Sequence, residues 1–271
     1  MKQKIIGMMT AWACEKWVKP AIEQAIHYCD DVVVSVAAHH PDLQKYEDNT
    51  LAIVQSFGDK IKLVEPKLMG DHIVTKGQTL QKMLEASDYN ETGNWIWILD
   101  ADEFYFEEDV ELCKTEIETD LYNSIELPEK FFYINCQNYL KSARRRFKKI
   151  IDKNTRFSTA NHFGPEEPVK YVETTKGIYH YSWLMNPYLK KDFWNIEYMH
   201  TNQRDKVDWI EDTYLTYDLK NPTANPQGPH SFEPDANGFL FKYKEAHPPW
   251  VEKYGLHLIE DFRKEYNEIG K

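Results

Sequence analysis

Three carboxylates follow a run of five apolar residues in the segment from Trp95 to Phe104, which reads WIWILDADEF. Carboxylates this close repel one another, so a positive charge is expected among them. In an extended segment, side chains two residues apart share a face, so Asp100 and Asp102 are expected in one pocket while Glu103 points elsewhere. Two convergent carboxylates are half of a Mg²⁺ or Mn²⁺ site, whose other positions phosphate oxygens commonly fill. The alternative is that these residues only cap a helix expected from about Glu107.

The first hundred residues alternate short apolar runs with segments of helical periodicity. The apolar runs predict strands at residues 4–9, 32–37, 61–65 and 95–99, separated by helices in the order β-α-β-α-β-α-β. This alternation implies an α/β fold whose mainly parallel sheet has right-handed crossovers and is flanked by helices. Such sheets bind ligands beyond the carboxyl ends of their strands, which is where Asp100 lies.

The pattern changes from about residue 124 to a long strand-like segment, SIELPEKFFYIN, followed by basic and aromatic stretches. We therefore predict an α/β part over residues 1–123 and a mixed α+β C-terminal lobe over residues 124–271, within one continuous domain. Residues 221–238 are rich in proline and glycine, which predicts an irregular loop, either a lid or a tether. The apolar spacing over residues 250–267 predicts a closing helix.

Composition excludes some classes of partner. The chain has 33 Lys and Arg against 44 Asp and Glu, a net charge of −11, which excludes broad nucleic-acid or anionic-lipid binding but allows local basic patches. The four cysteines show no CxxC pair, which favours reduced thiols in a cytoplasmic protein. No apolar run is long enough to be transmembrane. The segment MKQKIIGMMTAWAC is predicted to form the first core strand and the start of a helix. The alternative is a secretory or lipoprotein signal.

The DADEF segment after the fourth expected strand resembles the DxD motif of GT-A glycosyltransferases, particularly family-2-like enzymes. The resemblance covers about residues 4–105 and implies a GT-A-like, Rossmann-like fold. It also implies a metal-dependent transferase that moves a sugar from a nucleotide-diphosphate donor to a hydroxyl group of a glycan or another acceptor. In that family Asp100 and Asp102 would hold Mn²⁺ or Mg²⁺ against the donor diphosphate. The family's Asn-Glu turn survives only as Glu15, and Ser35 stands where an aspartate is usual.

The resemblance suggests further ligands. Many GT-A enzymes carry a histidine on a late strand, which makes His180 in GIYHYSW the candidate third metal ligand, with His162 in NHFGPEEP as a competitor. The alternative for His180 is a histidine packed in the core. The segment TKGQTLQKML resembles the family's basic-Gly segment, so Lys76 near a helix start is expected to approach a phosphate, unless it is a solvated lysine.

An inverting transferase also needs a carboxylate base, for which Glu166 and Glu167 are the first candidates and Glu103 the next. Each could equally be an ordinary glutamate. The run ARRRFKK is typical of a solvated face. The alternative is that one or two of Arg144, Arg145, Arg146 and Arg156 bind the donor diphosphate or an anionic acceptor, and Arg156 in KNTRF is the preferred single candidate. Among the aromatic residues of the second half, Trp183 is the preferred platform for a sugar ring.

Two other functions fit the same residues. A nucleotidyl- or phosphoryltransferase would use the same carboxylates and metal, but it normally has a glycine-rich phosphate loop, and Gly7 stands alone in that region. A non-catalytic carbohydrate-binding protein on a GT-A-like fold would hydrolyse donors only at background level and would tolerate the loss of Asp102.

Overall fold

The computed structural model describes residues 2–38, 40–66, 72–158, 163–198, 214–220 and 240–264. The chain divides into two compact units. The first unit contains Met1–Pro128 and Ala143–Ile178, and the second contains Glu129–Ser142 and Tyr179–Lys271. The sequence suggested one boundary near residue 124, whereas here the chain returns to the first unit after Ser142, so that two long strands contribute residues to both units.

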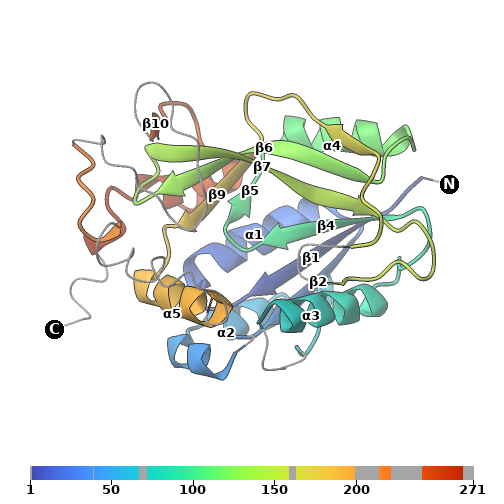
Figure 1. Cartoon of the computed structure of the whole chain (residues 1–271), viewed down its shortest axis with the longest axis horizontal. Helices are drawn as coiled ribbons and strands as arrows, with labels where there is room; N and C mark the ends of the chain where they lie inside the picture. Colours follow the sequence, from blue (N-terminus) through green and yellow to red (C-terminus); the bar gives the residue numbers. More distant parts are fainter. Residues whose placement is uncertain are drawn as a thin grey trace. The chain divides into compact units, whose positions relative to one another are not determined.

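The first unit is built on parallel strands joined by helices (Figure 1). The strands are β1 (Ile5–Ala11), β2 (Asp31–Val36), β3 (Lys62–Leu63) and β4 (Trp95–Asp100). They lie in the order β3-β2-β1-β4, and each neighbouring pair is parallel. The connections contain α1 (Glu15–Tyr28), α2 (Thr50–Gln55) and α3 (His72–Ala86). The predicted alternation, and the α/β fold with a mainly parallel sheet flanked by helices, are confirmed.

The remaining elements of the first unit extend this sheet. After β4 come β5 (Glu103–Phe104) and α4 (Glu107–Glu118). Strand β7 (Asn138–Lys149) pairs antiparallel with β4, β6 (Ser124–Tyr133) follows β7 in the sheet, and β8 (Val169–Tyr171) pairs parallel with β6. The basic run ARRRFKK is therefore a sheet strand beside β4.

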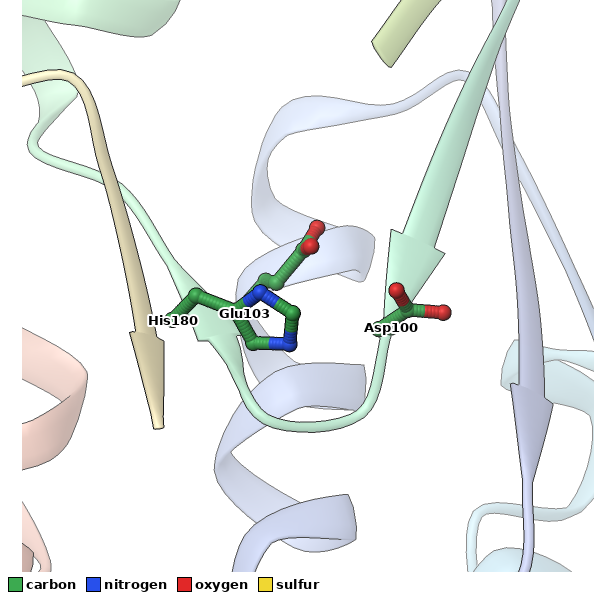
Figure 2. Close-up of side chains that lie close together, drawn as sticks. All are labelled: Asp100, Glu103 and His180. Atoms are coloured by element: carbon green, nitrogen blue, oxygen red, sulfur yellow. The ribbon is translucent and has the colours of Figure 1, made fainter. Parts of the chain in front are cut away.

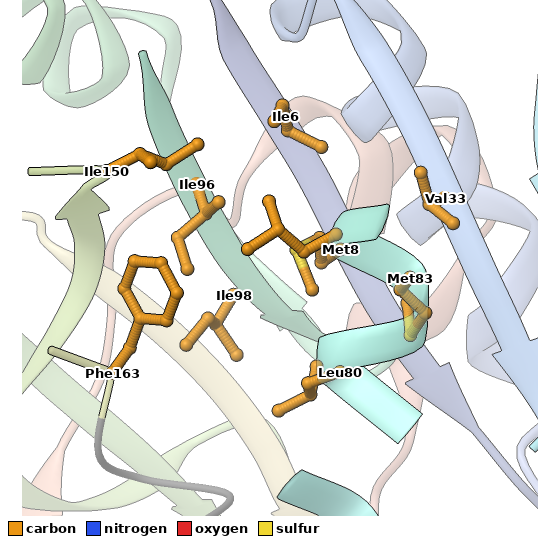
Figure 3. Close-up of a cluster of buried hydrophobic side chains, with 10 residues drawn as sticks. Ile6, Met8, Val33, Leu80, Met83, Ile96, Ile98, Ile150 and Phe163 are labelled. Atoms are coloured by element: carbon orange, nitrogen blue, oxygen red, sulfur yellow. The ribbon is translucent and has the colours of Figure 1, made fainter. Parts of the chain in front are cut away.

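Side-chain alternation along β1 and β4 separates the two faces of the sheet. One face packs against α3 in the cluster of Figure 3, whose members are Ile6, Met8, Val33, Leu80, Met83, Leu84, Ile96, Ile98, Ile150 and Phe163. The other face carries Trp97, whose ring lies 6.3 Å from that of Tyr28 on α1. Asp100 is in phase with Ile96 and Ile98, so it is directed to the α3 side at the carboxyl end of β4.

The second unit has a largely aromatic core. Its elements include β9 (Ile178–Trp183), α5 (Pro187–Tyr198), β10 (Phe241–Lys242) and α6 (Pro249–Lys253), and β10 pairs antiparallel with β7. The core cluster consists of Phe131, Tyr133, Ile134, Leu140, Trp183, Tyr214 and Tyr217. These strands and helices agree with the predicted mixed α+β lobe.

The predicted closing helix over residues 250–267 is wrong within the described residues. Helix α6 ends at Lys253, and Gly255 then takes a left-handed φ of 68° before the 3₁₀ turn Leu256–Leu258. A left-handed glycine stops a helix, which apolar periodicity alone does not reveal. The predicted loop at residues 221–238 lies outside the described residues. Among the helices that are described, none has the length and apolar character needed to span a bilayer.

A buried histidine lies among the aromatic residues of the second unit. The hydroxyl of Tyr181 is 2.7 Å from Nδ1 of His247, and the ring of Tyr243 lies 4.8 Å away. Burial, together with the nearby His257, lowers the pKa of His247 from 6.5 to about 4. The folded unit therefore holds this imidazole in its neutral form over most of the acidic range.

Gly177 lies where two segments of the first unit come into close contact. Its φ is +73°, and a Cβ there would lie 2.1 Å from the carbonyl oxygen of Pro128. We expect Gly177→Ala to lower the free energy of unfolding by more than about 2 kcal/mol, measured by denaturant titration. The control is Gly58→Ala, which has a φ of +55° and no atom within 4 Å, and should cost only the backbone strain of about 1 kcal/mol. Equal losses would contradict the close approach.

The lowered pKa of His247 predicts that the free energy of unfolding depends on pH. Because the folded pKa of about 4 lies below the ordinary value of 6.5, the unfolded chain binds a proton first as the pH falls through this interval. We expect the wild-type protein to lose on the order of 1 kcal/mol of unfolding free energy from this residue between pH 7 and pH 5. His247→Gln should show a shallower dependence in denaturant titrations at the two pH values. Parallel curves for the two proteins would contradict the assignment.

Candidate functional site

Asp100, the last residue of β4, lies among cationic side chains of the first unit. Its Oδ2 accepts a hydrogen bond from Nη2 of Arg146 at 2.6 Å, and its Oδ1 accepts one from Nζ of Lys76 at 3.2 Å. Nη1 of Arg144 is 3.8 Å from the same Oδ2, which is longer than a hydrogen bond. The positive charge expected among the carboxylates is thus supplied by the chain itself.

Glu103 converges on the same arginine. Nη2 of Arg146 also donates to Oε1 of Glu103, and carboxylate oxygens of Asp100 and Glu103 lie within 4.8 Å of each other. Figure 2 shows Asp100 at the end of β4 and Glu103 on β5. The prediction that Glu103 points elsewhere was wrong, because β4 ends at Asp100 and a turn interrupts the strand alternation before β5 begins.

The side chain of Gln24 fixes the backbone around Glu103. This residue of α1 is fully buried, and its Nε2 donates to the carbonyl of Glu103 at 3.1 Å while its Oε1 accepts the N–H of Tyr105 at 2.8 Å. The ring of Tyr105 meets Trp97 edge-on at 4.8 Å, and its hydroxyl is 3.4 Å from Oε2 of Glu103. Glu103 is fully buried, with its carbonyl held by Gln24 and its carboxylate beside the hydroxyl of Tyr105.

Strand β7 supplies the arginines by its alternation. Trp97 of β4 lies opposite Phe147, so in this antiparallel pair the preceding residues of β7 run toward the end of β4. Arg144 and Arg146 share one face of β7 and reach Asp100. Arg145, between them, pairs instead with Glu126 at 2.8 Å and Glu166 at 3.0 Å. Both arginines were predicted as possible diphosphate ligands, but they were not placed beside Asp100, because the basic run was not assigned to a strand, where residues two apart share a face.

Asp102 lies on the buried side of the turn after β4, with 5% of its surface exposed. Its charge acts on Cys14 at the start of α1. Burial, and to a lesser extent the charges of Asp102 and Asp48, raises the pKa of the Cys14 thiol to about 12. Its predicted role as a metal ligand stays a prediction.

In this arrangement Arg146 would compete with a divalent metal for the carboxylates of Asp100 and Glu103. Nη2 of Arg146 lies within hydrogen-bonding reach of Asp100 and Glu103, which is the position of a cation that bridges the two carboxylates. A guanidinium remains charged in proteins, so a metal would have to displace it against charge repulsion. Mn²⁺ or Mg²⁺ on Asp100 stays a prediction that this geometry does not favour.

The two histidine candidates differ in how far the structure describes them. His180 is on β9 in the second unit, 4% exposed, with Nδ1 2.8 Å from Oε1 of Glu129 and its ring 4.6 Å from that of Phe131. The buried carboxylate of Glu129 orients the imidazole within that unit. Its role as third ligand stays a prediction, and His162 lies outside the described residues.

The predicted catalytic bases have ionic or backbone partners. Glu166 binds Lys148 with one oxygen and Arg145 with the other, at 3.0 Å. Burial acts to raise the pKa of Glu166, but these cationic hydrogen bonds outweigh it and lower the pKa, which makes the carboxylate a weaker base. Glu167 is exposed, and its Oε2 accepts the N–H of Val169 at 3.2 Å. Of the two, Glu167 is the more accessible to an acceptor.

The three other predicted residues have clear local environments. Lys76 lies within α3, after its first residue His72, and its ammonium contacts Asp100 as described above. Arg156 is exposed and donates to the carbonyl groups of Lys153 and Thr155, 2.8 and 2.9 Å away in its own loop. Trp183 is only 4% exposed within the aromatic core of the second unit, so a sugar could stack on it only by displacing its neighbours.

Comparisons with known proteins reveal a distant likeness only. No protein-family model matches the chain, and no curated protein shows a significant match. Among solved structures, TarS 1–349 of S. aureus aligns with 81% of this chain and 77% of its own, at 10% identity and a TM-score of 0.44. Rv0371c from Mycobacterium tuberculosis H37Rv aligns with 64% of this chain and 89% of its own, at 9% identity and a TM-score of 0.34. The functional argument therefore rests on the geometry of the site.

The guanidinium of Arg146, which hydrogen-bonds to both Asp100 and Glu103, is expected to contribute strongly to stability. Arg146→Gln should lower the free energy of unfolding by about 3–5 kcal/mol, because it leaves the buried charge of Glu103 without its cation. Adding Glu103→Gln should recover most of that loss, since the two amides carry no charge. Arg145→Gln on the same strand should cost less than about 1 kcal/mol, because its ion pairs are exposed. Denaturant titrations of these variants measure the coupling, and purely additive losses would contradict it.

Proposed function

We propose that the protein is a glycosyltransferase that moves a sugar from a nucleotide-diphosphate donor to a hydroxyl group of a glycan or another acceptor. The observation that carries the proposal is the grouping of Lys76, Arg144 and Arg146 around Asp100. The grouping lies at the carboxyl end of a parallel strand, where α/β sheets bind their ligands. Three cations at one strand end suit an anionic group.

The chemistry of arginine favours phosphate as that group. Guanidinium groups donate in a planar fork that matches phosphate oxygens, and a lysine adds a compact positive charge. The DADEF segment supports the same assignment, because its resemblance to the DxD motif implies that a donor diphosphate binds at this strand end. The proposal joins these two independent lines at the single residue Asp100.

Transfer of the sugar requires stabilisation of the negative charge that develops on the diphosphate leaving group. The bond between the anomeric carbon and the diphosphate oxygen breaks, its electron pair stays on that oxygen, and the carbon bonds to the acceptor oxygen. Lys76 and Arg144 would stabilise the negative charge that develops on the leaving group. The acceptor proton would pass to a carboxylate, for which Glu167 is the most exposed of the predicted candidates.

We assign this step to the chain's own cations rather than to the predicted metal. A divalent cation, when bound, would supply Lewis-acid stabilisation of the same leaving group. Asp100 and Glu103 are the carboxylates that would hold it, and both already accept hydrogen bonds from Nη2 of Arg146. The acceptor side is proposed to come from the predicted C-terminal lobe, residues 124–271, which includes Glu167. The free cysteines support the predicted cytoplasmic location.

A panel of nucleotide sugars with uridine, guanosine, adenosine, cytidine and thymidine bases tests the activity. We expect one donor to release its nucleoside diphosphate above background, measured by chromatography with Mn²⁺ and Mg²⁺ present. Lys76→Gln should lower kcat/KM for that donor by about tenfold or more, because it removes a charged hydrogen-bond donor. Lys82→Gln, further along the same helix, serves as the control because Lys82 donates to the carbonyl of Glu65 instead.

The products distinguish the alternative functions. Release of pyrophosphate, with the nucleoside monophosphate transferred, would identify a nucleotidyltransferase. Hydrolysis at background level for every donor, in protein that remains folded, would contradict a transferase and favour the carbohydrate-binding alternative.

A further inference from the structure

We infer that the donor diphosphate is bound directly by Lys76 and Arg144, with Arg146 in the place of a divalent metal as a positioning residue. This inference rests on the proposed function and deepens it, because it names what neutralises the diphosphate. It departs from the metal-dependent site that the DADEF segment predicts.

The first argument for this inference is the balance of charges at the carboxyl end of β4. Asp100 and Glu103 contribute two negative charges against three positive charges from Lys76, Arg144 and Arg146. Even when the neighbouring Asp102 is counted, the carboxylates only equal the cations. Among the described residues, a divalent metal would add two further positive charges beside three cations that already contact these carboxylates, whereas a diphosphate would bring negative charge toward those cations.

The exposure of the three cations assigns their roles. The side chain of Arg146 is only 8% exposed, and its Nη2 donates hydrogen bonds to the carboxylates of Asp100 and Glu103. Arg146 therefore positions these two carboxylates and is not itself accessible to a ligand. The side chains of Arg144 and Lys76 are 34% and 24% exposed, so solvent and ligand reach both. Nη1 of Arg144 lies 3.8 Å from Asp100, which is beyond hydrogen-bonding distance.

Asp100 then has a role opposite to that of a metal ligand. Its carboxylate gathers Lys76, Arg144 and Arg146 at one place before any ligand binds. A phosphate oxygen that approaches Lys76 competes with Asp100 for the ammonium and is repelled by its charge. Removal of that charge should therefore strengthen binding of an anion, whereas it would abolish binding that depends on a metal held by Asp100.

Calorimetric titration of the full-length protein tests the inference. The ligands are inorganic pyrophosphate and the five nucleoside diphosphates in EDTA, the nucleoside diphosphates again with Mn²⁺, and Mn²⁺ alone. We expect pyrophosphate and one nucleoside diphosphate to bind in EDTA, and Mn²⁺ alone not to bind. Arg144→Gln should weaken binding in EDTA by about tenfold or more. Arg145→Gln is the matched control, with the same charge change on the same strand but with Glu126 and Glu166 as partners.

Asp100→Asn gives an outcome of opposite sign for the two mechanisms. Unchanged or tighter binding of pyrophosphate in EDTA supports the cationic site. Binding of a nucleoside diphosphate only with Mn²⁺, and its loss in Asp100→Asn, would overturn this inference and leave the proposed function standing. Equal weakening by Arg144→Gln and Arg145→Gln would show general electrostatic attraction and would also overturn it. No binding of any diphosphate in either condition would overturn the inference and the proposed function together.

Discussion

The first unit depends on one guanidinium that serves two carboxylates. Nη2 of Arg146 bonds to Asp100 at the end of β4 and to Glu103 on β5, so it closes the turn between these strands by charge. Without a cation there, the buried carboxylate of Glu103 would carry a large desolvation cost. The hydrogen bonds of Gln24 with the carbonyl of Glu103 and the N–H of Tyr105 fix the backbone after this turn from α1. The chain thus stabilises a strand end rich in negative charge with its own side chains.

The layers of the sheet explain why cations from distant segments meet here. Lys76 comes from the helix on one face of β4, whereas Arg144 and Arg146 come from the antiparallel neighbour of β4. Each segment is held by apolar packing, in the α3 cluster and in the stack of Trp97 on Phe147 at 4.6 Å. The polar contacts therefore refine positions that the core has already determined, which is the usual relation between a rigid scaffold and a site at its edge.

Sequence predicted the α/β half of the chain well, because there each element has its own periodic signal. The strand WIWIL and the helix over Leu80 to Leu84 follow directly from apolar spacing. The turn after Asp100 has no such signal, so side-chain alternation was extended past the end of the strand and Glu103 was assigned to the wrong face. The partners of Arg146 were missed for a different reason: they are remote from it in sequence, and only the register of β7 against β4 brings them together. Long-range register is what periodicity within one segment cannot supply.

The side-chain amide of Gln24 has a consequence for finding distant relatives. It donates to one backbone group and accepts from another, a pairing that glutamate at neutral pH or leucine cannot reproduce. The acidic motif alone is short and matches unrelated sequences by chance. A glutamine on the first helix, an aspartate and a glutamate three residues apart after the fourth strand, and two arginines separated by one residue on a later strand form a much rarer combination. A search that requires all three would retrieve proteins with this strand end even where overall identity has fallen below detection.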